Sequence, residues 1–315
     1  MTVLVNERIA ERVTRAGPRR RRPVWEEEPS PVGKVLKAVG LTAVVLAVLF
    51  PLYVVVLTSL STNQAVTRAG GLVVVPDGLS FGAYREILGG GVVSRSLVVS
   101  IGITLVGTAF SLALTLLAAY GLSRPGSFAH RPLLFVVLLT FLFGPGLIPT
   151  FLLVQSLGLL DTYAALILPG AVAAFNLVVL RGFFMSIPQE LIDSARIDGA
   201  GEFRIFGRIV LPLSKAVTAV IALFYGVGYW NAFFNALLYL NSNEKWPLQM
   251  VLRTYVLQGQ PIEGANPDAI VAGGAVPTLA VKMAVVVFAL LPVLVIYPFV
   301  QRHFTKGVII GAIKG

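Results

Sequence analysis

Residues 96–122 read SLVVSIGITLVGTAFSLALTLLAAYGL, a run of 27 residues without one charged side chain. Crossing the ~30 Å hydrocarbon layer of a bilayer takes ~20 mostly apolar residues, so this run is long enough to span a membrane. A helix is the expected structure, because it satisfies its own backbone hydrogen bonds in lipid. The run also lacks the two-residue alternation that is typical of a membrane barrel strand.

Five more segments have the same character, and they cover residues 35–59, 133–154, 163–180, 217–240 and 277–300. The whole composition agrees with them. Of 315 residues, 56% are hydrophobic and 13% are charged, against ~25% charged in an ordinary soluble domain. Because the chain has no cysteine, disulfides and thiolate metal sites are excluded. The sequence predicts an all-α membrane protein with six transmembrane helices.

The distribution of Lys and Arg sets the expected orientation. With the N-terminus inside, the inner segments hold 19 of the 25 basic residues. These segments are 1–37, 123–132, 181–215 and 301–315. Basic residues concentrate on the cytoplasmic side of membrane proteins, so we expect both termini in the cytoplasm. Residues 1–34 are predicted to be a flexible basic tail, 35–300 the membrane domain and 301–315 a cytoplasmic C-terminal tail.

The four arginines at 19–22 would suit a nucleic-acid patch, but in front of six spans they are more typical of a topology anchor. We therefore expect no nucleic acid as a partner. A cleaved signal peptide is disfavoured, because the apolar core of the first span exceeds the usual ~7–15 residues.

Several classes of activity lack the residues that they need. The predicted spans contain no acidic residue, whereas ion-coupled carriers normally place a carboxylate at depth. No Walker or HExxH motif is present, and His130 and His303 are the only histidines, so no catalytic or metal site is predicted. A membrane-embedded transferase is disfavoured, since the acids of the outer side are scattered. Any energy from ATP would have to come through another chain.

Some polar and aromatic side chains are predicted inside the spans and are candidates for a solute pathway: Asn176, Tyr225, Tyr229, Trp230, Asn231 and Asn235. Asn231 and Asn235 are four residues apart and are expected on one helical face. Asn together with Tyr or Trp suits a sugar, which needs hydrogen bonds and flat apolar contacts. The alternative is that these side chains join helices or lie at the membrane interface. Gly144-Pro145-Gly146 indicates a kink.

The inner loop at 186–214 reads SIPQELIDSARIDGAGEFRIFGRIVLPLS. Ser186 and Gln189 have the spacing of a capping box, and Gly199 is placed to end a short helix. A second amphipathic segment follows, and Pro212 marks the turn into the fifth span. The pattern fits either a helix that docks a partner or an amphipathic connector at the headgroups.

Asp193-Ser194-Ala195, Gly199 and Ile209-Val-Leu-Pro212 resemble the EAA loop of permease subunits in ATP-binding-cassette importers. That pattern is Glu-Ala-Ala, three residues, Gly, nine residues and Ile-x-Leu-Pro. The resemblance implies the type I importer permease fold, in which this loop is a cytoplasmic coupling helix that docks on an ATPase subunit. It assigns these residues to ATPase coupling: Glu190, Asp193, Ser194, Ala195, Asp198, Gly199, Ala200, Ile209, Leu211 and Pro212.

Other stretches are similar to the second permease subunit of maltose-type carbohydrate importers, within the branch for alginate-like and plant-polysaccharide fragments. They are Gly146-Leu-Ile-Pro-Thr-Phe, Leu157-Gly-Leu-Leu-Asp-Thr, Trp230-Asn231 and the ending from Lys306. The resemblance implies a multi-pass subunit of a prokaryotic plasma membrane that imports a carbohydrate. The same superfamily also imports peptides, amino acids and anions, which is the alternative.

The partners that the resemblance implies are a homologous second permease, two ATPase subunits and an extracytoplasmic solute-binding protein, besides membrane lipid. ATP and Mg would be bound by the ATPase subunits, and no cofactor by this chain. Lys314 and Gly315 are expected to contact the ATPases. The outer loops 60–95 and 241–276 are expected to dock the binding protein.

Overall fold

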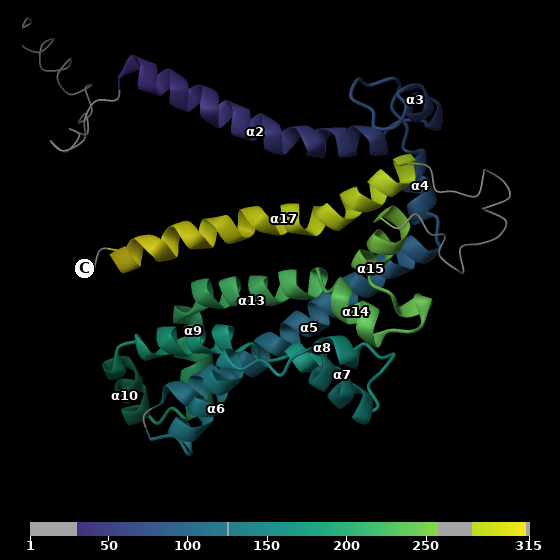
Figure 1. Ribbon diagram of the computed structural model, residues 1–315. Helices are drawn as coiled ribbons and strands as arrows, with labels where there is room; N and C mark the ends of the chain where they lie inside the picture. Colours follow the sequence, from purple (N-terminus) through teal and green to yellow (C-terminus); the bar gives the residue numbers. More distant parts are fainter. Residues whose placement is uncertain (1–29, 125, 258–278, 313–315) are drawn as a thin grey trace, which may run out of the picture. The chain divides into compact units, whose positions relative to one another are not determined.

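The computed structural model describes residues 30–124, 126–257 and 279–312. These residues form helices and turns, and their only β-pairing is an isolated bridge between Ser61 and Leu79. The contacts divide the chain into two units, Met1–Leu52 and Tyr53–Gly315. Figure 1 labels the helices, and each unit is described by itself.

The described part of the first unit is the beginning of helix α2 (Pro31–Ser59). The residues of α2 up to Leu52 are all exposed, although most are apolar. This helix matches the first predicted span, and it starts four residues before the predicted position.

Helix α5 (Val92–Ser123) is central to the second unit and coincides with the run of residues 96–122. It packs against α9 (Ala174–Met185) and α13 (Lys215–Trp230), as Figure 1 shows. The buried face of α5 carries small residues, which let neighbouring helices approach closely in a membrane protein. Large apolar side chains of α9 and α13, such as Leu177, Leu180 and Ile221, complete this core.

A second core cluster lies around α17 (Leu279–Ala312). This helix packs against α13, α3 (Asn63–Arg68), α4 (Gly82–Leu88) and α15 (Leu248–Leu252). By residue number, α3 and α4 belong to the predicted outer loop 60–95. Helix α17 runs past the predicted end of the last span at residue 300 and continues to Ala312.

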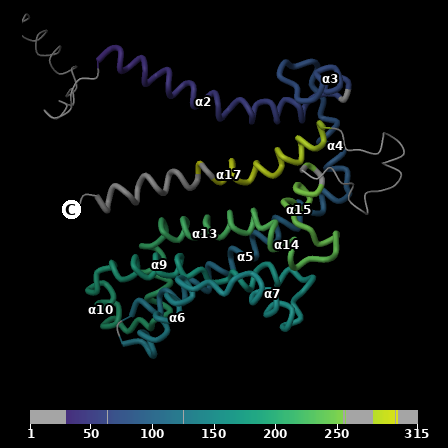
Figure 2. The backbone as a smooth tube through the Cα atoms, in the orientation of Figure 1, coloured from purple at the N-terminus to yellow at the C-terminus, as the bar shows by residue number. Residues whose placement is uncertain are grey.

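The predicted spans at 133–154 and 163–180 are helical, but the structure breaks each of them, and Figure 2 shows the first break between α6 (His130–Leu142) and α7 (Leu147–Ser156). These two helices are bent by 119°. Gly144-Pro145-Gly146 occupies the break, where Pro145 has no N–H to continue a helix. The kink that this tripeptide indicated is confirmed.

The segment at 163–180 contains α8 (Ala164–Ile167), a 3-10 turn η1 (Leu168–Gly170) and α9, with a bend of 51°. Pro169 lies in the 3-10 turn. The segment at 217–240 divides into α13 and α14 (Phe233–Tyr239). Asn231 and Asn235 therefore do not share one helical face, contrary to the prediction.

Three helices of the described residues are long and apolar enough to cross a membrane, and up to six spans result if each bent pair counts as one. The third bent pair joins Glu202–Leu213 to Lys215–Trp230 at 85°, so the predicted inner loop runs directly into the fifth predicted span. Residues 1–29 of the basic tail, Lys314, Gly315 and residues 258–276 of the predicted outer loop lie outside the described residues.

Candidate functional site

The candidate coupling loop is the predicted inner loop at 186–214. Its first helix is α10 (Gln189–Ile197), which ends just before Gly199 as predicted. The backbone of Gly199 has φ +77°. The N–H of Gly199 donates to the Arg196 carbonyl at 3.0 Å, and that of Ala200 donates to the Ala195 carbonyl at 2.9 Å. These two bonds form a Schellman motif, which satisfies the last carbonyls of the helix. The helix is thereby ended within two residues of Ile197.

The predicted capping box at the start of α10 was wrong. Ser186 is the C-cap of the preceding helix α9, and its hydroxyl donates to the Phe183 carbonyl at 2.7 Å. The Ser186 side chain is thus engaged in the turn before α10. The Gln189 side chain instead donates to Asp193 Oδ1 at 3.2 Å, and Pro188 holds the N-cap position.

The two sides of the coupling loop differ in exposure. Ile192 and Ile205 are fully buried, and Ala195 and Ala200 pack against the main core. On the opposite side, the side chains of Ile197 and Phe203 are exposed, at 87% and 86%. The expected coupling residues Glu190, Asp193, Ser194 and Asp198 are exposed with them. Ile197 and Phe203 are thus two exposed apolar side chains within the loop whose coupling residues the sequence pattern defined.

A polar network connects α10 to the end of α5. Arg196 bonds to Glu202 Oε1 at 2.8 Å and to Asp193 Oδ1 at 3.4 Å. The Tyr120 hydroxyl, on the last turn of α5, donates to Glu202 Oε2 at 2.6 Å. The hydrogen bond to Glu202 raises the pKa of Arg196. Sequence reasoning missed Tyr120 and Glu202 as partners because they are 82 residues apart.

The remaining coupling residues lie where the loop turns into α13. α11 (Glu202–Ile205) is followed by a π-helical turn η2 (Phe206–Val210) and by α12 (Leu211–Leu213). Ile209 and Leu211 pack against the main core, and Pro212 is exposed. A π-helical turn offsets the chain from the regular helical path, and here only α12 separates it from the 85° bend.

The two candidate pathway tyrosines are buried between helices. The Tyr229 hydroxyl donates to the Ile167 carbonyl at 3.2 Å and lies 2.7 Å from Ser111 Oγ on α5. The Tyr225 hydroxyl lies 2.7 Å from Thr115 Oγ1 and accepts from the Ala173 N–H at 2.9 Å. Both side chains therefore join α13 to its neighbours, which accounts for their burial. Their part in a solute pathway stays a prediction.

The other pathway candidates are in different environments. Trp230 is buried, and its Nε1–H donates to the Ala289 carbonyl on α17 at 2.9 Å. Asn176 is buried on α9. Asn231 and Asn235 are exposed, and the Asn231 amide donates to the Val227 carbonyl at 2.9 Å. Asn231 thus stands at the C-cap of α13, where the helix stops and α14 has not begun.

Sequence reasoning also missed the hydroxyl stripe of α5, which recurs at intervals of three or four residues. Its members are Ser96, Ser100, Thr104, Thr108, Ser111 and Thr115. Ser100 accepts from the Leu248 N–H at 2.7 Å, in addition to the two bonds to tyrosines. The four-residue spacing is visible in the sequence and would have indicated the helix face that meets α13.

The predicted outer side contains a further polar cluster centred on Asp161. Its carboxylate accepts from Lys245 Nζ at 2.7 Å, from the Ser242 hydroxyl at 2.7 Å and from the N–H groups of Asn241 and Ser242. Lys245 and Ser242 hold the pKa of Asp161 well below its usual range. The cluster ties the segment before α8 to the segment after α14.

The chain matches one protein family and is similar to several transport system permease proteins. Residues 107–310 match the family described as binding-protein-dependent transport system inner membrane component. The chain is 46% identical to the polygalacturonan/rhamnogalacturonan transport system permease protein YtcP of Bacillus subtilis (strain 168), over 84% of this chain and 92% of that protein. It is 31% identical to the arabinooligosaccharides transport system permease protein AraQ of the same organism, over 85% and 91%.

A solved structure is similar over almost the full length. It is the crystal structure of a bacterial ABC transporter involved in the import of the acidic polysaccharide alginate. One of its chains matches with a TM-score of 0.80 and 30% identity, covering 90% of this chain and 100% of that chain.

Proposed function

Because this chain belongs to the family of binding-protein-dependent transport system inner membrane components, we propose that it is one permease half of an ATP-driven carbohydrate importer. The single observation that carries this is the capped helix α10, which presents exposed apolar and acidic side chains while a polar network anchors it to α5. The exposed side is the surface on which an ATPase subunit would dock.

The solute that we propose is an oligosaccharide released from an acidic polysaccharide. YtcP is named for polygalacturonan and rhamnogalacturonan, and the similar solved transporter imports alginate, an acidic polysaccharide. These polysaccharides all contain uronic acids, so their fragments share hydroxyl groups, flat apolar sugar faces and carboxylates. The spans of this chain hold no acidic residue that would repel such an anion.

The proposed coupling acts through a rigid connection. Movement of an ATPase against Ile197 and Phe203 would reach α5 through the Arg196–Glu202–Tyr120 bonds. It would reach α13 through the short segment of Ile209, Leu211 and Pro212, which precedes the 85° bend. The exposed acids of α10, the Ser194 hydroxyl and the small residues Ala195, Gly199 and Ala200 would shape the docking surface.

The proposed solute pathway includes the interruption between α13 and α14. Discontinuous helices in transporters leave polar backbone groups at the depth where a solute binds. Asn231 and Asn235 are exposed around this interruption, whereas Tyr225, Tyr229, Trp230 and Asn176 would support the helices behind it. We therefore assign direct solute contact to the two asparagines.

The proposed topology has six spans, both termini in the cytoplasm and the loop 186–214 on the ATPase side. The distribution of basic residues supports it. The proposed assembly contains a homologous second permease, two ATPase subunits that bind ATP and Mg, and a solute-binding protein outside. Lys314 and Gly315 would lie against the ATPases, and the membrane would be the plasma membrane of a prokaryote.

Purification of the intact complex tests this function. The complex, reconstituted with its binding protein, is offered oligogalacturonate, alginate oligosaccharides, neutral oligosaccharides, a peptide mixture and phosphate. We expect acidic oligosaccharides to stimulate ATP hydrolysis and to enter the vesicles. Stimulation by peptides or phosphate alone would reject the carbohydrate assignment.

The docking surface is tested separately by crosslinking. In this cysteine-free chain, an Ile197→Cys variant should crosslink to cysteines placed in the groove of the ATPase. The matched control is Ile192→Cys on the same helix, whose side chain is buried in the core and should react less. Equal reaction at Ile197 and Ile192, or none at Ile197 across several groove positions, would contradict docking on this surface.

A further inference from the structure

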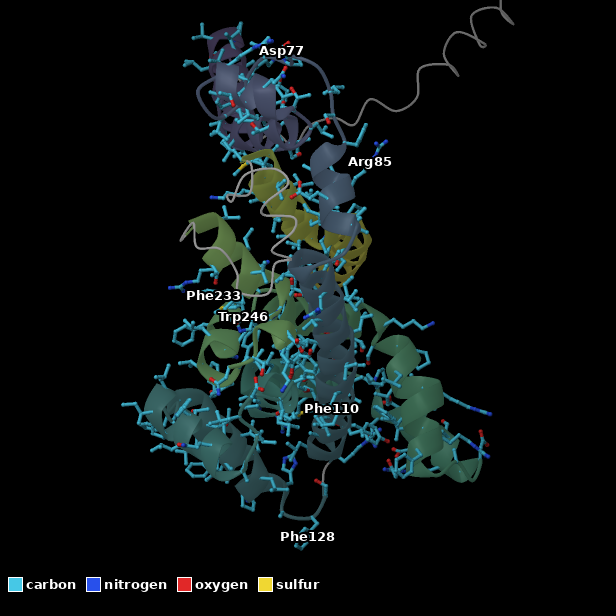
Figure 3. The ribbon with its side chains drawn as sticks, turned by 90° about the vertical axis from the view of Figure 1, so that its right-hand side faces the viewer. Asp77, Arg85, Phe110, Phe128, Phe233 and Trp246 are labelled. Carbon is cyan, nitrogen blue, oxygen red and sulfur yellow. The ribbon has the colours of Figure 1, made fainter. Side chains whose placement is uncertain are left out.

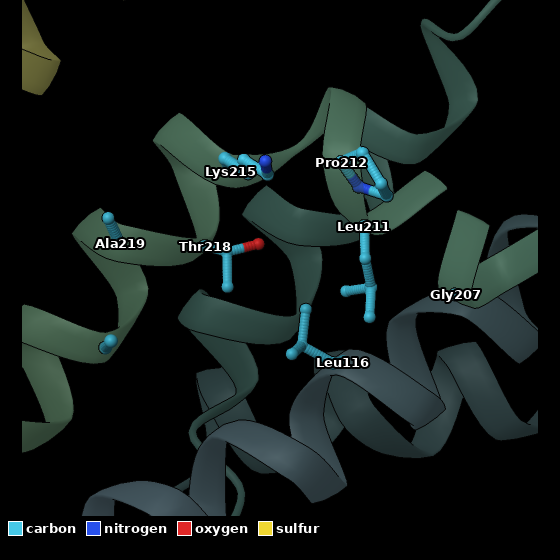
Figure 4. A pocket seen from close by; sticks show the side chains of 8 residues that line it. Leu116, Gly207, Leu211, Pro212, Lys215, Thr218 and Ala219 are labelled. Carbon is cyan, nitrogen blue, oxygen red and sulfur yellow. The ribbon is translucent and has the colours of Figure 1, made fainter. Parts of the chain in front are cut away.

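A pocket of about 480 Å³ lies where the coupling loop meets the predicted membrane spans. Figure 4 shows it between α5, the end of the coupling loop and the first turns of α13. Its lining residues are Leu116, Gly207, Leu211, Pro212, Lys215, Thr218, Ala219 and Ala222. Leu211 and Pro212 also belong to the proposed coupling segment, but the cavity itself has no role in the coupling or solute pathway described above.

The pocket is apolar except at two positions. Lys215 lies along one side, and the Thr218 hydroxyl points into the space between Leu116 and Leu211 (Figure 4). This hydroxyl is buried and has no hydrogen-bond partner within the described part of the chain. A buried polar atom without a partner is unfavourable, and a ligand that accepts its proton removes that cost.

The charge beside the pocket is positive. Arg204 and Arg208 flank the lining residue Gly207 in sequence, and Lys215 lies in the lining itself. Among the described residues, none of these three side chains forms an ion pair. The neighbouring carboxylate of Glu202 is occupied by Arg196 and Tyr120. The pocket is therefore apolar, with one unpaired positive side chain, Lys215, in its described lining.

We propose that this pocket binds an anionic phospholipid of the cytoplasmic leaflet. The headgroup phosphate lies against Lys215 and accepts from Thr218, and an acyl chain follows Leu116, Ala219 and Ala222. One phospholipid molecule thus supplies a negative charge for Lys215 and an acyl chain for the apolar lining. Basic pockets between spans on the cytoplasmic side are known to bind such headgroups. The inference rests on the proposed topology, which puts the pocket at the headgroup level.

The test uses the assembled importer in vesicles of phosphatidylcholine and phosphatidylglycerol in equal parts, with a trace of photoactivatable phosphatidylglycerol. After illumination, labelled peptides are mapped by mass spectrometry. We expect label on the segments 207–222 and 112–120. Lys215→Gln should reduce this label by about fivefold, the factor that corresponds to ~1 kcal/mol for one basic residue near an anionic surface. Lys215→Arg should restore it.

Thr218→Val keeps the shape of the side chain and removes the hydroxyl, so it should also reduce the label. Arg131→Gln is the matched control, since it removes an exposed basic residue from another predicted inner loop and should leave the label at 207–222 unchanged. The inference is overturned if the label at 207–222 does not change in Lys215→Gln. It is also overturned if the cysteine of an Ala219→Cys variant crosslinks to the second permease, which would then occupy the pocket.

The readout is independent of import. If the pocket is labelled but the complex imports no carbohydrate, the lipid site is supported and the proposed function is rejected. A complex that imports oligosaccharides without such label would retain the function and reject the site.

Discussion

Gly199 is the residue on which the shape of the coupling loop depends. A Cβ at this position would meet no atom within 4 Å, so the obstacle to another residue is the backbone at φ +77° and not crowding. This conformation costs roughly 1–2 kcal/mol for a residue with a side chain.

We expect Gly199→Ala to loosen the turn after α10 and to lower solute-stimulated ATP hydrolysis more than basal hydrolysis. Gly201→Ala is the matched control, because Gly201 has φ −71° and also has open space around it. Measurement of both rates in reconstituted complexes checks this. Equal losses in the two variants would indicate a general defect of the loop.

Gly107 is constrained by crowding. A Cβ on this residue would lie 2.9 Å from the ring of Tyr229, so α5 and α13 could not keep their separation. We expect Gly107→Ala to destabilise the protein by about 1–3 kcal/mol, as overpacking of a core does. Gly102→Ala on the same helix meets no atom within 4 Å and should be neutral or slightly stabilising. Thermal unfolding in detergent compares the two.

Among the elements, the connection between the loop before α8 and the loop after α14 depends on Asp161. We expect Asp161→Asn to lower the midpoint of thermal unfolding at neutral pH, because it removes the charge that Lys245 and two backbone N–H groups bind. Asp77→Asn is the control, since Asp77 pairs with Arg68 at an exposed site, where an ion pair contributes little. A shift no larger than that of Asp77→Asn would contradict a stabilising role.

The same cluster predicts a pH dependence. The pKa of Asp161 is lowered in the folded protein, so its contribution is complete above the unfolded value of ~3.9 and is lost as the pH falls towards the folded value. The difference in unfolding midpoint between the parent protein and Asp161→Asn should be constant from about pH 7 to pH 5. It should shrink below about pH 4. A difference that shrinks already near pH 6 would assign the effect to another group.

The elements show which features a sequence discloses. Helices α2 and α5 were predicted to within a few residues, because each is one unbroken apolar run and the bilayer fixes its length. The interruptions of the other spans were less visible. Gly144-Pro145-Gly146 indicated a kink but not a bend of 119°. The amino-acid sequence around Asn231 contains no signal that distinguishes the end of a helix from its interior.

The candidate site divides in the same way. Gly199 could be predicted because the signal is local, a glycine directly after an amphipathic helix. The role of Ser186 was predicted wrongly, since its hydroxyl had two possible turns to serve and the geometry of α9 decided between them. The pairing of Tyr120 with Glu202 depends on tertiary packing over 82 residues. The exposure of Ile197 and Phe203 depends on the same packing.

For the whole molecule, the absence of cysteine makes the proposed topology directly measurable. Phe128 is 95% exposed and projects from the loop between α5 and α6 (Figure 3), and Asp77 lies in the predicted outer loop. We expect a membrane-impermeant maleimide to label an Asp77→Cys variant in intact cells whose outer membrane, if any, is permeabilised. A Phe128→Cys variant should react only after the plasma membrane is opened. Labelling of Phe128→Cys in intact cells would reverse the orientation.

The contact between Gly107 and Tyr229 also has a consequence for sequence divergence. The two positions are far apart in the chain, yet position 107 cannot take a larger residue while Tyr229 is present and α5 and α13 keep their spacing. In lineages that carry a larger residue at position 107, the aromatic ring at position 229 should have been replaced by a smaller side chain. Tyr229 should therefore be inherited only together with Gly107.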